Sequence, residues 1–404
     1  MSPADPGSRP RVLWITEEPP DRSLGGGNIR QAHLIEGVGR RAEVTLLMFG
    51  SLRDEGVRAA VADVVEVHGV PLPAPRRRWV RRLHDLRIAW RGPREVAVPA
   101  RRRAAVRKRL RPLEAQADLV VASHLGMAVV RPRDARARWV AQLHHVTSAR
   151  VEQERSVTTG RRQRWLLARD AVLARRVERQ LLDELDGVVA VSDDDAALLT
   201  AGEPPRARVL VAPNGVDVDR YRPTALPERP SILMTGTFDY GPNVDGARWL
   251  CDDVLPRVQA EVPEATLALV GRAPAPEVVA LGDRRGVTVH ADVPDMVPFL
   301  DAARVAVVPL RVGTGTRLKA LEAMAAGRQV VGTSVGLEGL DLLAGTHADV
   351  ADDADAFAEA IVRVLRDDGH ARALASAGRE LVVERYHWPV LADRFADDLL
   401  GLLG

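Results

Sequence analysis

The stretch RVAVVPLRVGTGTRLKALEAMAAGRQVVGTS (residues 304–334) predicts a buried strand, a glycine-rich loop, a helix and a second buried strand. Each strand segment is a short, nearly continuous apolar run, which is typical of parallel strands covered on both faces. Within the helix, Leu318, Leu321 and Ala325 form an inner stripe, and Gly327 stands where a glycine commonly ends a helix. This alternation indicates an α/β fold with a parallel sheet.

The same alternation continues along the chain in both directions. Apolar runs that predict strands begin at residues 11, 43, 64, 118, 138 and 186 in the first half and at residues 231, 265, 287, 304 and 328 in the second. Pro213, Asn214 and Gly215 interrupt an apolar run between the halves, and residues 223–230 have the composition of a linker. We therefore predict two doubly wound, Rossmann-like α/β domains, residues 1–215 and 216–387.

The two predicted domains are expected to face each other across a cleft, because open parallel sheets bind ligands beyond the carboxyl ends of their strands. Residues 388–404 carry apolar side chains at helical spacing after Pro389. They predict a C-terminal helix that packs back toward the first domain.

Composition limits the class of protein. The single cysteine excludes an internal disulfide framework, and the first residues lack the apolar core of a signal peptide, so we expect a cytoplasmic protein. No run approaches the roughly 18 apolar residues of a membrane span. Residues 1–215 carry 38 basic and 26 acidic side chains, whereas residues 216–404 carry 19 and 29. The basic first half is suited to an anionic partner.

The loop and helix start of the opening stretch form a candidate anion site. Lys319 is one of only two lysines among 57 basic residues. With Thr316 as the N-cap, backbone N–H groups of residues 315–318 would bind an anion, and Lys319 would add a compact ammonium. Glu322 lies about 9 Å along the helix from Thr316, so its carboxylate would reach ligand hydroxyls such as those of a ribose. The alternative is an exposed ion pair between Lys319 and Glu322.

Two further stretches are candidates for ligand contacts. Gly25, Gly26 and Gly27 follow the first predicted strand, where they would let the backbone approach a phosphate or would form a loop without a ligand. His144 and His145 end another predicted strand and are suited to proton transfer, hydrogen bonding or a structural role. Adjacent histidines point in opposite directions and no third ligand has suitable spacing, so we predict no metal site.

Residues 76–111 contain 15 basic and two acidic side chains. Trp79, Leu83, Leu86 and Trp90 fall on one stripe of a helix whose other faces carry arginine. This pattern predicts a helix that lies on an anionic membrane surface; a solvated arginine face with tryptophan in the core is the alternative. Nucleic acid is not an expected partner, because no nucleic-acid-binding module is recognisable.

Over most of its length the sequence resembles glycosyltransferase family 4, whose GT-B fold consists of two facing Rossmann-like domains. The likeness is carried by GGGNIR (25–30), DGVVAVSDDDAALL (186–199), VLVAPNGVDVDRYRP (209–223), LMTGTFDYGPNVDGARWL (233–250) and residues 309–340. The last block is most similar to the exopolysaccharide-type branch. The resemblance implies retaining transfer of a sugar from a nucleotide-diphosphate sugar, with neither a metal ion nor another cofactor.

The resemblance also implies roles for individual residues. Those assigned to the donor nucleotide sugar are Gly25, Gly26, Gly27, Thr314, Gly315, Thr316, Arg317 and Lys319, of which the glycine loop, Arg317, Lys319 and the amides near Thr316 would hold its diphosphate. Glu322 matches the second glutamate of the Glu-x7-Glu motif of the family and would bind the ribose. His144 matches a histidine that would contact the transferred sugar near the reacting carbon. Together with Arg317 and Lys319, it is a predicted catalytic residue.

The sequence departs from the family pattern at three positions. Thr314 replaces the first glutamate of the motif, which usually holds sugar hydroxyls. The arginine and lysine expected after the first strand of the second domain are replaced at Thr237 and about Asn243. Arg317 and Lys319 are therefore expected to supply a larger share of the charge that binds the diphosphate.

These observations predict a transferase, peripheral on the inner membrane face, that acts on a lipid-linked or polysaccharide acceptor. One alternative is transfer to a soluble small molecule such as a secondary metabolite. Another is a GT-B protein that binds nucleotide sugar without turnover, which the loss of a carboxylate at Thr314 favours. A GT-B epimerase ranks lower, because no set of carboxylates is placed for proton abstraction.

Overall fold

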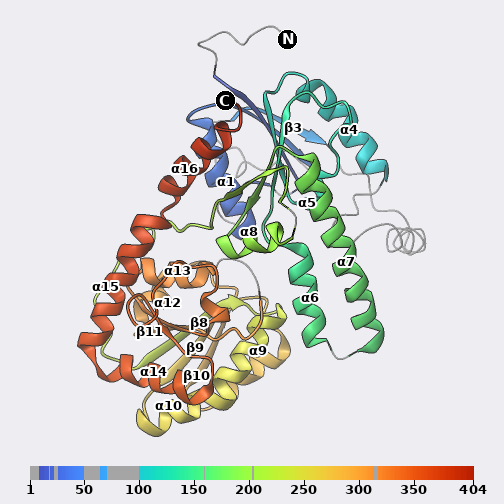
Figure 1. Ribbon diagram of the computed structural model, residues 1–404. Coiled ribbons are helices and arrows are strands. Elements are labelled where there is room, and N and C mark those ends of the chain that lie inside the picture. Colours follow the sequence, from blue (N-terminus) through green and yellow to red (C-terminus); the bar gives the residue numbers. More distant parts are fainter. Residues whose placement is uncertain are drawn as a thin grey trace. The chain divides into compact units, whose positions relative to one another are not determined.

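The structure is a computed structural model that describes residues 9–17, 19–21, 26–49, 64–70, 100–158, 160–202, 204–313 and 317–404. The chain divides into two compact units (Figure 1). The first unit is Met1–Pro213 with Leu391–Gly404, and the second is Asn214–Val390. Each unit is built on one parallel sheet covered by helices on both faces.

The first unit has a seven-stranded sheet in the order β3-β2-β1-β4-β5-β6-β7. Its strands are β1 (Arg11–Thr16), β2 (Glu43–Phe49), β3 (Val64–Val70), β4 (Leu119–Ser123), β5 (Arg138–Gln142), β6 (Gly187–Ala190) and β7 (Arg208–Val211). All neighbours run parallel, with Arg11 opposite Glu43 and Val12 opposite Leu119. The strand order therefore reverses between β1 and β4, which is the switch point where doubly wound sheets bind ligands.

Helices cover both faces of this sheet. They are α1 (Gly26–Gly39), α4 (Ala100–Glu114), α5 (Leu125–Ala128), α6 (Thr147–Val157), α7 (Arg161–Glu184), α8 (Asp193–Thr200) and α16 (Trp388–Leu400). Val12 and Trp14 pack with α1 and α16, whereas Leu13 and Ile15 pack with α4, α5 and α7 on the opposite face. Because both faces are buried, β1 is continuously apolar from Val12 to Ile15 rather than alternating.

The end of the chain belongs to the first unit through α16. The rings of Trp14 and Phe395 meet edge to face, with their centroids 6.3 Å apart. A Cβ atom added to Gly37 of α1 would lie only 2.5 Å from the carbonyl oxygen of Ala392. The backbones of α1 and α16 therefore approach more closely than a larger residue would allow.

The second unit has a six-stranded parallel sheet in the order β10-β9-β8-β11-β12-β13. Its strands are β8 (Ser231–Thr237), β9 (Thr266–Arg272), β10 (Val287–Ala291), β11 (Val305–Val308), β12 (Gln329–Gly332) and β13 (Asp349–Val350). The main helices are α9 (Gly241–Trp249), α10 (Leu255–Glu261), α12 (Val297–Ala302), α13 (Leu318–Ala325), α14 (Ala354–Arg366) and α15 (Asp368–Arg385). This order has its switch point between β8 and β11.

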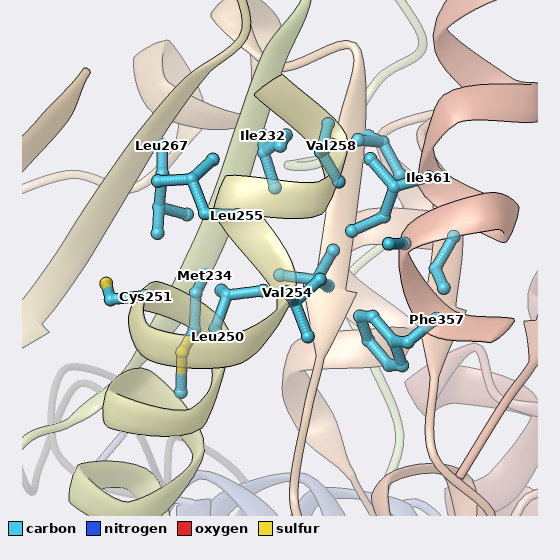
Figure 2. Packing of buried hydrophobic residues seen from close by; sticks show 14 of the residues in the cluster. Ile232, Met234, Leu250, Cys251, Val254, Leu255, Val258, Leu267, Phe357 and Ile361 are labelled. Atoms are coloured by element: carbon cyan, nitrogen blue, oxygen red, sulfur yellow. The ribbon is translucent and has the colours of Figure 1, made fainter. Parts of the chain in front are cut away.

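One face of the second sheet is covered by a nearly continuous helical segment. The π-helical turn η1 (Leu250–Val254) joins α9 to α10. Figure 2 shows Leu250, Val254 and Val258 from this segment among the side chains of Met234 on β8 and Phe357 on α14, all of them buried. The opposite face is covered by α12, α13 and α15. The segment packs α9, which follows β8 at the carboxyl edge of the sheet, against this core.

The predicted GT-B fold class is confirmed, and each of the eleven predicted strands forms in the expected place. Two strands were missed. β7 is part of the apolar run that we interpreted as leading into the linker, and β13, with two residues, is too short to produce a pattern. Trp79, Leu83, Leu86 and Trp90 lie outside the described residues. None of the helices in the described part of the chain combines the length and the apolar composition that a membrane span needs.

Candidate functional site

Two segments of the second unit meet at the switch point of its sheet. One is the end of β8 with the first turn of α9, and the other is the loop that leads from β11 to α13. β8 and β11 are parallel neighbours, with Ile232 opposite Val305, so their carboxyl ends lie at the same edge. A Cβ atom added to Gly246 would lie 2.8 Å from the carbonyl oxygen of Pro309, so α9 packs closely against the end of β11.

Lys319 and Asn243 join these two segments. The Lys319 ammonium donates a hydrogen bond of 2.7 Å to Oδ1 of Asn243, and Nδ2 of Asn243 donates one of 2.8 Å to the carbonyl oxygen of Thr237. A carbonyl oxygen can accept from the amide nitrogen of Asn243 but not from its amide oxygen, so Nδ2 faces Thr237 and Oδ1 faces the lysine. A Cβ atom on Gly236 would lie 3.0 Å from the same amide nitrogen, which leaves the Asn243 side chain little room to turn.

The environment of Lys319 disfavours its positive charge. Burial, and then the positive charge of Arg317, lower the pKa of Lys319 to about 7, and the charge of Glu322 only partly opposes them. The acceptor held by the ammonium, the Asn243 amide, is neutral. An anion that replaced this amide would restore the charge of Lys319.

Arg317 braces the loop before α13. Its guanidinium donates to the carbonyl oxygens of Gly313, at 2.7 Å, and Val335, at 2.9 Å, and it is only 7% exposed. Gly313 has a φ of +132°, a conformation that favours glycine. In this structure Arg317 therefore shapes the loop through backbone contacts and places its positive charge beside Lys319.

The start of α13 differs from the prediction. We expected Thr316 as the N-cap, but the helix begins at Leu318 with Arg317 at the cap position, and Lys319 is its second residue. The backbone of Arg317 is non-helical while its side chain is held by the carbonyl oxygen of Val335, so the helical conformation begins only at the next residue. Thr314, Gly315 and Thr316 lie outside the described residues. Gly327 has a φ of +68° directly after the helix, as predicted.

Glu322 lies one turn further along α13 and is held by Tyr221. The Tyr221 hydroxyl donates a hydrogen bond of 3.2 Å to Oε1 of Glu322. Burial raises the pKa of Glu322, and the bond from Tyr221 partly offsets this effect. The alternative of an exposed Lys319–Glu322 ion pair is wrong, because neither residue is exposed and each has a different partner.

His144 lies at the corresponding edge of the first unit, two residues after β5. Its ring stacks on that of His124, with centroids 4.1 Å apart and an angle of 13° between the planes. His124 has a φ of +68°, an unusual conformation for a residue with a side chain. Burial, and then the charges of His124, Arg30 and His145, hold the pKa of His144 well below its ordinary value. Its imidazole is therefore neutral at neutral pH, and among the described residues its Nε2 has no hydrogen-bond partner.

Sequence reasoning missed Arg30 and Gln31, which follow the glycine-rich loop. Gly26 and Gly27 begin α1, and Gly25 lies outside the described residues. Arg30 and Gln31 are fully buried on the side of α1 that faces the sheet, and burial lowers the pKa of Arg30 to about 9. Because Arg30 shares a helical stripe with Leu34 and Val38, a charged residue within an apolar stripe was the signal that could have revealed it.

Two Rossmann-type units, each with polar side chains at its switch point, are the architecture of the GT-B fold. Comparison with solved structures supports this fold. Sucrose-phosphate synthase from Thermosynechococcus elongatus superposes with a TM-score of 0.71 and 20% identity, over 98% of this chain and 99% of that one. HepE of Anabaena, solved with UDP and glucose, gives 0.66 and 15%, over 97% and 99%.

Sequence profiles then identify the family. Residues 24–220 match Glycosyltransferase Family 4, and residues 229–367 match Glycosyl transferases group 1. The chain therefore belongs to the family 4 glycosyltransferases, as its motifs predicted. One curated relative is the GDP-mannose-dependent α-(1-6)-phosphatidylinositol monomannoside mannosyltransferase of Mycobacterium tuberculosis, which is 29% identical over 255 residues. The match covers 57% of this chain and 65% of that relative, which is less than two thirds of its length.

Proposed function

We propose that the protein is a retaining, metal-independent glycosyltransferase that moves a sugar from a nucleotide-diphosphate sugar to a lipid-linked or polysaccharide acceptor at the inner membrane face. Membership of the family supports sugar transfer. The main support for the proposal is the half-buried Lys319 ammonium, which donates to a neutral amide at the switch point of the second sheet.

The donor diphosphate would replace Asn243 as the partner of Lys319. A charge-assisted hydrogen bond of this kind contributes about 1.5–3 kcal/mol. Arg317 adds positive charge to the same region without leaving its backbone partners. These cations would stabilise the diphosphate as it departs, which supplies by electrostatics what a metal ion supplies in other transferases.

Glu322 and Tyr221 would bind the nucleoside. A carboxylate that already accepts one bond from a phenol retains capacity to accept from the two hydroxyls of a ribose. Glu322 lies three residues after Lys319 on α13, which corresponds to about 4.5 Å of helix rise. This order along the helix matches the order of diphosphate and ribose in a nucleotide.

His144 would contact the transferred sugar. Its neutral imidazole, with a pKa well below the ordinary value, is suited to a hydrogen bond rather than to ion pairing. In the transfer step, the bond from the anomeric carbon to the diphosphate oxygen breaks, and a bond to the acceptor oxygen forms on the same face. The acceptor proton passes to the leaving diphosphate.

The mycobacterial relatives are named for GDP-mannose and a phosphatidylinositol mannoside, which makes GDP-mannose the first donor to test and a lipid the first acceptor. The test is release of nucleotide from GDP-mannose, UDP-glucose and dTDP-glucose in EDTA, with and without a bacterial lipid extract. Release that depends on the extract supports a lipid-linked acceptor.

A second candidate, binding without turnover, is favoured by the threonine at position 314, where the family has a carboxylate. Such a protein would bind one of these donors tightly and release no nucleotide under any condition. Stoichiometric binding with no release over many hours would therefore support this candidate over the transferase.

A further inference from the structure

The outer face of α7 combines exposed aromatic and basic side chains. α7 has 24 residues and packs beside α6, as Figure 1 shows, and the backbone N–H of Ser148 donates to the Glu178 carboxylate at 3.0 Å. Its inner face is buried in the first unit through Asp170, Ala171, Ala174, Glu178, Leu181 and Leu182. The outer face is therefore the part of α7 that remains available to a partner.

Trp165 is 66% exposed on this outer face, and Val172, seven residues further along, is 50% exposed. Two residues seven apart lie on the same stripe of a helix. Exposed arginines border this stripe: Arg161, Arg162, Arg164, Arg175 and Arg176. The boundary between lipid and water suits this surface, because a large aromatic ring can leave water there while the guanidinium groups beside it stay at the headgroups.

The charge of this surface is positive and largely uncompensated. α7 has no acidic residue before Asp170. Among the described residues, the side chains of Arg161, Arg162 and Arg164 have no ion-pair partner. Of the carboxylates of α6, Glu154 pairs with Arg150, and Glu152 pairs with Arg155 and also feels the charge of Arg175, both of which lower the pKa of Glu152.

We propose that the outer face of α7 docks on a bilayer that contains anionic lipid headgroups. The arginines would contact headgroup phosphates, while Trp165 and Val172 would enter the boundary between headgroups and acyl chains. From Arg161 to Arg176 the face extends about 22 Å at 1.5 Å per residue, so it can lie along the surface rather than touch it at one point. The inference rests on the proposed function at one point, since a lipid-linked acceptor would bring the protein to a membrane.

Charge complementarity favours a membrane over the other partners of a basic face. Each basic residue near an anionic bilayer contributes about a fivefold factor in affinity, so three arginines can change binding by about a hundredfold. A nucleic acid would use the arginines without requiring Trp165 or Val172 to leave water. A second copy of the chain would bring a second set of like charges against the first.

The test is sedimentation with phosphatidylcholine vesicles that contain or lack phosphatidylglycerol. The variant is Arg161→Gln with Arg162→Gln and Arg164→Gln. The matched control is Arg138→Gln with Arg206→Gln and Arg208→Gln, which removes three exposed arginines near the amino-terminal ends of β5 and β7. We expect the wild type and control to bind anionic vesicles and the α7 variant to bind at least tenfold more weakly.

A second readout reports on Trp165 itself. Brominated acyl chains should quench part of the tryptophan fluorescence of the wild type, and Trp165→Phe should lose that part. The proposal fails if the α7 variant binds anionic vesicles as tightly as the control does, or if the wild type does not bind them. It also fails if only substitutions within residues 76–99 abolish the binding of vesicles. It also fails if the α7 variant loses self-association or nucleic-acid binding instead. Nucleotide affinity, measured on the same samples, should be unchanged, so failure of the transferase proposal would appear separately.

Discussion

The affinity for nucleotide sugar should fall as the pH rises above neutrality, because Lys319 must be charged to bind the diphosphate. In the free protein the pKa of Lys319 is about 7, and two phosphate groups would raise it toward its ordinary value of 10.5. Binding therefore takes up a proton between these two values. Each pH unit above 7 should weaken binding by up to tenfold, or about 1.4 kcal/mol.

Asn243→Asp should remove this pH dependence. A carboxylate at the position of the amide, 2.7 Å from the ammonium, would keep Lys319 charged in the free protein and would compete with the diphosphate. Breaking a buried pair of this kind costs about 3–5 kcal/mol when one partner is lost, so binding at pH 7 should weaken by at least tenfold. Asn243→Ala, which adds no charge, should retain the pH dependence.

The assay is calorimetry with a nucleotide sugar between pH 6.5 and 8.5, in buffers of different ionisation enthalpy. A diphosphate esterified at both ends does not itself titrate in this range, so the protons counted come from the protein. The wild type should take up nearly one proton at pH 8.5, and Asn243→Asp should take up almost none. Equal proton uptake in both, or binding that strengthens with pH, would refute the assignment of Lys319 as the diphosphate ligand.

Two further substitutions test the second unit. Tyr221→Phe should weaken nucleoside diphosphate binding by about 0.5–1.5 kcal/mol and leave pyrophosphate binding unchanged, because only the bond to Glu322 is lost; equal losses for both ligands in calorimetry would contradict this role. Gly246→Ala should lower the melting temperature and weaken nucleotide binding, since its Cβ would lie 2.8 Å from the carbonyl oxygen of Pro309, at a cost of about 1–3 kcal/mol. Gly241→Ala on the same helix, with no atom within 4 Å of the added Cβ, should change neither quantity.

The sheet architecture was largely predictable because it rests on local apolar runs. The run at residues 304–310 predicts β11 without knowledge of any other part of the chain, since a strand buried on both faces is apolar throughout. Gly327 likewise marked the end of α13 by its position alone. β13 escaped notice because its two residues pair with β12 only through the tertiary fold.

The chemistry of the site was less predictable, because it depends on contacts between distant segments. Lys319 was recognised from its rarity, but its partner Asn243 lies 76 residues earlier in the sequence. Their contact requires β8 and β11 to be neighbours, and strand order is not encoded in either segment. The partner of Glu322 was hidden for the same reason, because Tyr221 lies 101 residues before it.

We propose that the second unit binds a nucleotide-diphosphate sugar through Lys319 and that the protein transfers its sugar. The most direct measurement is sugar transfer from GDP-mannose, UDP-glucose and dTDP-glucose to a bacterial lipid extract in EDTA, by the wild type and by Lys319→Met. We expect transfer from one donor by the wild type and a rate at least tenfold lower in a folded Lys319→Met variant, because the variant loses about 1.4 kcal/mol or more of diphosphate binding. Equal rates for the two proteins, or no binding of any donor, would contradict it.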